Sequence, residues 1–150
     1  MLKRTISIPL YDCKVIVIFA PDINIESKRI CRKHKIDSED SAEEYCSVIS
    51  SPDSVHLYYI LFGTDYLTLN RFVHEISHLG GSILKSRGYT QIDDEPLAYL
   101  NGYIAQEIEK IMLKNNIEFI KAKNNAEKRK VHHQRLGMVG DDPSGNEGVR

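Results

Sequence analysis

The spacing of apolar and polar residues along this chain changes from a strand-like period to a helix-like one. Two short apolar runs near the N-terminus, residues 5–10 and 14–19, lack helical spacing and predict strands. The second run is β-branched and apolar at successive positions, which is typical of a strand covered on both faces. Pro9 has no backbone N–H to donate, so we expect the first strand to end there or to lie at a sheet edge.

The polar stretch at residues 24–52 gives weaker signals. Residues 25–33 predict a short surface helix. The sequence from Ser41 to Glu44 has the form of a capping box, and it predicts a second helix that runs through Ile49. Three residues of metal-ligand type in this stretch lack paired spacing, and we interpret them as packing residues: Cys31, His34 and Cys46.

The strongest strand pattern is at residues 55–62, which are aromatic and apolar almost throughout. A helix is predicted to follow as far as Arg87, with Asp65 or Thr68 as its N-cap and Gly88 just beyond its end. Its apolar residues fall within an arc of roughly 80° and predict one buried stripe. This stripe consists of Leu69, Phe72, Ile76, Leu79 and Ile83.

A second long helix is predicted at residues 95–114, with Asp94 as its N-cap. Its buried stripe consists of Leu97, Leu100, Ile104, Ile108 and Ile111. Residues 117–120 extend this helix or form a brief strand. From residue 121 onward the chain is polar, which predicts a flexible tail.

The predicted elements define an α+β fold, with a small, mostly antiparallel sheet packed on the first long helix and on the helix that follows it. We expect one domain at residues 1–120 and a polar tail at residues 121–150. The chain of 150 residues is long enough for such a domain to bury its own core.

Composition and charge exclude several classes of protein. A hydrophobic content of 41%, a charged content of 27% and a net charge of −1 are ordinary for a soluble domain and do not favour nucleic acid as a partner. The basic residues at 128–135 lack aromatic neighbours that could stack on bases, so we interpret them as part of a solvated tail. Three cysteines without paired spacing favour a reducing compartment. Since no secretory signal or membrane-length apolar run is present, we expect a cytoplasmic protein.

The first long helix carries the candidate chemistry, in the run His74-Glu75-Ile76-Ser77-His78. At about 100° per residue, His74 and His78 lie about 40° apart on one face, opposite the apolar stripe. Two imidazoles in this arrangement can bind one Zn²⁺, and Glu75 can then reach a water on the metal. We expect the strand at residues 55–62 to be an edge strand beside the metal, where an extended peptide could add to the sheet.

A hydrolytic zinc site needs a third protein ligand. Leu84 stands where the longer metzincin motif has its third histidine, so that class is excluded. The run Glu95-Pro96-Leu97-Ala98, following H-E-x-x-H, resembles the E-x-x-A segment of compact gluzincin-like zinc metallopeptidases. Residues 55–112 carry this resemblance. The run from Glu95 to Leu100, following a short H-E-x-x-H helix, is also similar to small zincins found in phage and prophage genomes.

The resemblance implies a minimal zincin-like domain in which zinc is held by His74, His78 and Glu95, with Glu75 as the general base. Asp93 or Asp94 could replace Glu95, or could orient the histidines. We expect the small residues Ala98 and Gly102, next to Glu95 on the helix, to let the two helices approach closely. The candidates for an oxyanion donor are His56, Tyr89, Tyr99 and Tyr103, of which Tyr99 has the best helical phase.

We therefore expect a zinc-dependent peptidase that hydrolyses a peptide bond of a peptide or protein substrate. The alternative is a non-catalytic zincin-like domain that serves binding or assembly, as in a phage-associated protein. If the protein is phage-encoded, it would act in the host cytoplasm or with the virion. His132 and His133 do not favour an additional metal site.

Overall fold

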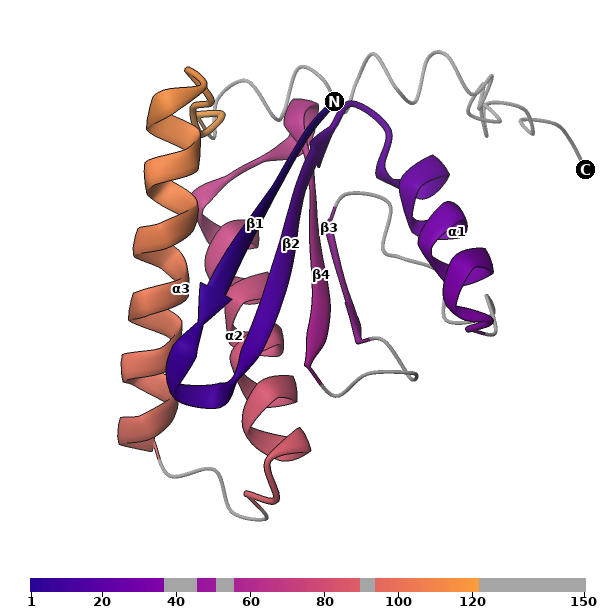
Figure 1. Cartoon of the computed structure of the whole chain (residues 1–150). Coiled ribbons are helices and arrows are strands. Elements are labelled where there is room, and N and C mark those ends of the chain that lie inside the picture. The colour runs from indigo at the N-terminus through magenta and orange to yellow at the C-terminus, as the bar shows by residue number, and fades with distance from the viewer. Residues whose placement is uncertain (37–45, 51–55, 90–93, 122–150) are drawn as a thin grey trace, which may run out of the picture. The chain divides into compact units, whose positions relative to one another are not determined.

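The structure is a computed structural model that describes residues 1–36, 46–50, 56–89 and 94–121. Residues 1–120 form one compact unit with a four-stranded sheet and three α-helices (Figure 1). The strands are β1 (Leu2–Ile8), β2 (Cys13–Ala20), β3 (Cys46–Ser50) and β4 (Leu57–Gly63). The helices are α1 (Ile23–His34), α2 (Leu69–Ser86) and α3 (Asp94–Lys114), with short 3-10 turns at Pro9–Tyr11 and Thr64–Tyr66.

The strands lie in the order β1-β2-β4-β3. β2 and β4 are parallel, whereas β1 pairs with β2 and β3 pairs with β4 in antiparallel register. The fold is therefore a mixed α+β arrangement whose sheet is mostly antiparallel. The predicted tail lies almost entirely outside the described residues, so the division at residue 120 stays a prediction.

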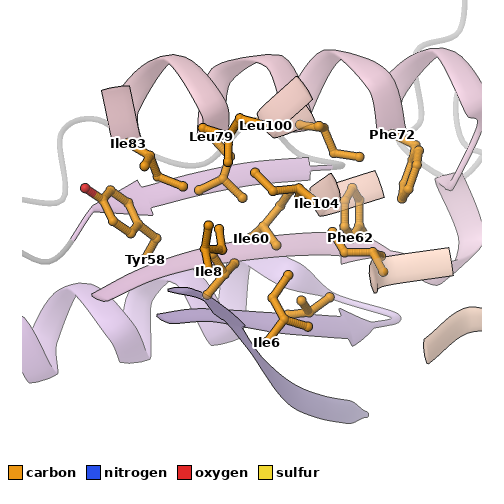
Figure 2. Packing of buried hydrophobic residues seen from close by; sticks show 14 of the residues in the cluster. Ile6, Ile8, Tyr58, Ile60, Phe62, Phe72, Leu79, Ile83, Leu100 and Ile104 are labelled. Atoms are coloured by element: carbon orange, nitrogen blue, oxygen red, sulfur yellow. The ribbon is translucent and has the colours of Figure 1, made fainter. Parts of the chain in front are cut away.

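Each face of the sheet is covered by helices because the central strands are apolar on both faces. On one face, Val15, Val17, Ile60 and Phe62 pack with the buried stripes of α2 and α3, as Figure 2 shows for part of this core. On the other face, residues such as Ile18, Tyr59 and Leu61 pack with α1. The H-E-x-x-H helix is thus anchored on the larger of the two cores.

Most strand predictions are confirmed. β1 is an edge strand that ends at Ile8, directly before Pro9. β2 is buried on both faces, as its β-branched run predicts. The strand at residues 55–62 is also present, as β4.

Two predictions for this region are wrong. The helix expected through Ile49 is instead strand β3, in which Val48 pairs with Ile60 and Ile49 with Tyr59; the start of that predicted helix lies outside the described residues. Val48 and Ile49 are apolar and β-branched, so pairing with β4 stabilises them more than a helix started by the local capping signal would. β4 is an interior strand rather than an edge, because β3 occupies its outer side.

The predicted ends of α2 agree with the structure. Leu69, predicted to lie in the buried stripe of this helix, is instead 59% exposed, because it is the first residue of α2 and lies at the end of the helix. Thr68 is the N-cap of α2, where its hydroxyl accepts a hydrogen bond from the backbone N–H of Arg71. Gly88 follows the helix with a positive φ of 84°, which favours glycine. α1 is longer and more buried than the predicted surface helix, since Ile23, Ile30 and Cys31 pack against the sheet.

Residues 117–120 neither extend α3 nor form a strand. Asn116 adopts a positive φ of 52° and ends the helix. The chain then returns to α2, where the backbone N–H of Ile120 donates to the carbonyl of Leu67 at 2.7 Å. Phe119 packs edge-on against Phe72 with ring centroids 5.2 Å apart, so this segment closes the N-terminal end of α2.

We expect Leu79→Ala, which truncates a side chain fully buried in the core of α2, to lower the free energy of unfolding by about 2–5 kcal/mol. Leu69→Ala, on the same helix but 59% exposed, should lower it by less than about 1 kcal/mol. Urea unfolding followed by circular dichroism would measure both values. Equal losses in the two variants would contradict the described rotation of α2.

Candidate metal centre

The rotation of α2 decides where its polar residues point. Ile76, Leu79 and Ile83 are buried against the sheet, so the opposite side of the helix faces solvent. His74 and His78 lie on that side, and both are exposed. Their Nε2 atoms are 2.9 Å apart, and their rings meet edge-to-face at 82°. The two imidazoles of the motif therefore converge, as predicted.

The distance between the two Nε2 atoms can be compared with the distance between two nitrogen ligands of a zinc ion. Zinc binds imidazole nitrogen at about 2.0–2.1 Å in a tetrahedral arrangement, which sets two ligand nitrogens about 3.3 Å apart. A small opening of the pair from 2.9 Å would give this spacing. The pair thus fits two of the positions around a zinc ion.

Glu75 lies at the border between the solvent face and the core of α2. Its side chain is only 6% exposed. Gly80 marks the side of α2 that touches α3, and Glu75 is turned about 140° from it. Since α2 also contacts β3, at the opposite edge of the sheet from β1, Glu75 lies on the β3 side of the helix.

The third predicted ligand, Glu95, is not brought to the pair. It is exposed in the first turn of α3, turned about 160° from Leu97, which faces α2. His78 is likewise turned about 160° from Gly80. Within the described ranges no group of three His, Cys, Asp or Glu residues could hold a metal. Asp93 and the side chain of Asp94 lie outside the described residues.

The close contact between the two helices is not where it was expected. Ala98 is exposed, and a Cβ added at Gly102 would meet open space. The close approach is at Gly80, where an added Cβ would lie 2.1 Å from Oδ1 of Asn101. This oxygen is buried and has no hydrogen-bond partner in the structure, so Asn101 fills the notch that Gly80 leaves. The prediction that Ala98 and Gly102 allow the close approach is therefore wrong, and Gly80 of α2 allows it instead.

The candidate oxyanion donors also lie elsewhere. Tyr89, Tyr99 and Tyr103 line a single pocket together with residues of the β1–β2 connection. Tyr99 is 74% exposed and is turned about 160° from Leu97, away from α2. His56 lies next to the C-terminal end of α2, where its Nδ1 is 2.6 Å from the carbonyl oxygen of Asp12. None of these four residues is placed beside the histidine pair.

Arg87, which sequence analysis passed over, organises a second polar cluster at the end of α2. One of its terminal nitrogens donates to the backbone carbonyls of Tyr11 and Asp12 and lies 3.2 Å from Nδ1 of His56. Burial raises the pKa of the neighbouring Cys13 thiol, whereas the Arg87 guanidinium acts in the opposite direction. These residues are far apart in the chain, so no local signal could have grouped them.

Comparison with protein-family models, with curated proteins and with solved structures gives no significant match. In the part of the chain that the structure describes, no helix has the length and apolar content needed to cross a membrane. The resemblance to zinc metallopeptidases therefore rests on the motif residues of the sequence and stays a prediction.

We expect His74→Ala and His78→Ala each to weaken zinc binding at least about 100-fold, because each removes one of the two converging imidazoles. Competition with a chromogenic zinc chelator at neutral pH would measure the affinities. His56→Ala is the matched control, since it removes an exposed histidine at the other end of α2. If the control weakens binding as much as the two variants do, zinc is not bound by the pair.

Proposed function

We propose that this chain is a zinc-dependent peptidase that hydrolyses a peptide bond of a peptide or protein substrate. The observation that carries the proposal is the convergence of His74 and His78, with buried Glu75 between them in sequence and next to them on the helix. A site whose metal served only to hold the fold together would not need a carboxylate at that position.

Each residue of the motif has a distinct task in this proposal. His74 and His78 supply two neutral imidazole ligands. Zinc, when bound, would lower the pKa of a coordinated water and polarise the scissile carbonyl. Glu75 accepts a proton from the attacking water and donates it to the leaving amine.

The sheet supports a peptide as the substrate. β3 is an edge strand and pairs only with β4 among the described strands, so its outer edge can receive an extended chain. α2 contacts β3, and Glu75 lies on that side of the helix. A peptide added along β3 would therefore pass near the motif, with main-chain hydrogen bonds holding it in register. In this proposal the substrate pairs with β3, rather than with β4 as the sequence suggested.

The proposal keeps Glu95 as the third ligand of the metal-bound protein. This requires the first turn of α3 to open, because Glu95 points away from α2 as described. Glu95→Gln should then weaken zinc binding at least about tenfold, whereas Glu109→Gln, an exposed carboxylate on the same helix, should not. Equal affinities for the two variants would assign the third ligand to another residue.

The second candidate function is a zincin-like domain that binds or assembles without catalysis. It is favoured by one observation, namely that the described residues bring no third ligand to the histidine pair. In that case the pair binds metal weakly, and the protein acts through a partner.

Glu75→Gln separates the two functions. We expect this variant to bind zinc as wild type does and to cleave a peptide library at least about 100-fold more slowly, because only the general base is removed. Mass spectrometry of the products and the zinc content of the purified protein are the measurements, with Glu109→Gln as the control. Zinc-loaded wild-type protein that cleaves nothing would favour the assembly function.

A further inference from the structure

A separate pocket lies between the β1–β2 connection and the first turns of α3. Its volume is about 530 Å³, within the range of small-ligand sites in proteins, about 300–1,000 Å³. Its walls are mainly apolar and aromatic. They include Pro9, Tyr11, Tyr89, Pro96, Tyr99 and Tyr103.

A second cavity of about 450 Å³ adjoins this tyrosine pocket. The two cavities share Leu10, Tyr11 and Tyr89. The second cavity also contains Arg87 and His56, so its character is polar where the first is apolar. Burial raises the pKa of the Tyr11 phenol, and the neighbouring Tyr89 phenol raises it further.

The guanidinium of Arg87 is held in place at this wall, and none of the described carboxylates forms an ion pair with it. One of its terminal nitrogens donates hydrogen bonds to the carbonyl oxygens of Tyr11 and Asp12. The Asp12 carboxylate lies instead 3.6 Å from His56. A half-buried cation with unused donors is a ready site for an anion.

We propose that the two cavities together bind the carboxyl-terminal residue of a peptide. Its large apolar or aromatic side chain would lie among the four tyrosines, and its terminal carboxylate would pair with Arg87. Aromatic walls favour an aromatic guest through offset or edge-to-face packing. The guanidinium fork suits a carboxylate, which can accept two parallel hydrogen bonds from it.

Two features of the surroundings select this ligand over other anions. The Asp12 carboxylate and the C-terminal end of α2 both place negative charge near Arg87, which opposes a phosphate dianion more than a single carboxylate. Leu10 and Tyr99 line the pocket but remain 83% and 74% exposed. A peptide could cover them with its preceding residues, whereas a small free acid could not.

This site does not depend on the metal. None of its lining residues belongs to the histidine pair, which lies on the side of α2 turned away from α3. The proposal can therefore hold or fail independently of the peptidase activity.

The test uses an N-terminally labelled pentapeptide that ends in phenylalanine with a free carboxylate. Binding to the full chain is followed by fluorescence anisotropy with EDTA present, so that cleavage cannot interfere. Matched peptides carry a C-terminal amide, or alanine in place of phenylalanine. We expect the free acid ending in phenylalanine to bind at least about tenfold more tightly than either. N-acetyl-phenylalanine as competitor distinguishes a peptide from a free acid, and should compete at least about tenfold more weakly than the unlabelled peptide.

Two variants locate the site. Tyr99→Ala and Arg87→Gln should each weaken binding at least about fivefold, and Arg87→Gln should abolish the preference for the acid over the amide. Leu113→Ala, which is 72% exposed on the same helix and outside both cavities, is the control. If Arg87→Gln does not fold, the comparison of acid with amide in wild type still decides the role of the charge. Equal binding of acid and amide, no effect of Tyr99→Ala, or equal competition by N-acetyl-phenylalanine would each overturn the proposal.

Discussion

The packing of α2 on the β1–β2–β4 face of the sheet determines where all the candidate chemistry lies. Ile76, Leu79 and Ile83 are buried against β4, and burying side chains of this size contributes about 1.5–3 kcal/mol each. A rotation by one residue, about 100°, would move these side chains toward solvent and carry polar ones into the core. The rotation of α2 is therefore fixed, and with it the outward direction of His74 and His78.

A second constraint follows from the contact between α2 and α3. Asn101 and Leu97 pack at Gly80, while Leu100 and Ile104 hold α3 on the same core as α2. Because both helices are fixed in rotation by apolar residues, their polar faces diverge. The histidine pair faces solvent on the side of α2 opposite its buried stripe, whereas α3 presents its tyrosines toward the β1–β2 connection. The positions of the histidine pair and of the tyrosine pocket are consequences of the same packing.

The pattern of apolar residues was sufficient to predict those helices and strands whose own sequence shows a clear periodicity. The β-branched run predicts the strand β2, and the apolar stripes at helical spacing predict α2 and α3. β3 could not be predicted in this way, because Val48 and Ile49 become a strand only when β4 is available to pair with them. The same limit applies to the site. Convergence of His74 and His78 follows from helical spacing within one element, whereas the relation of Glu95 to them depends on the mutual rotation of two helices.

The cost of bringing Glu95 to the histidines depends on which motion is considered. Rotating α3 as a rigid body by about 160° would expose Leu100, Ile104 and Ile108, at a cost of about 1.5–3 kcal/mol for each side chain. Opening only the residues before Leu97 leaves those three side chains in the core. Opening these residues breaks the hydrogen bonds that their carbonyls accept from N–H groups of the next turn, and those carbonyls can then bind water. Structural zinc sites contribute about 10–16 kcal/mol of binding free energy in small peptides, which far exceeds the cost of one helical turn. A third ligand from the first turn of α3 is thus compatible with the fold only through local unwinding, and the core itself need not move.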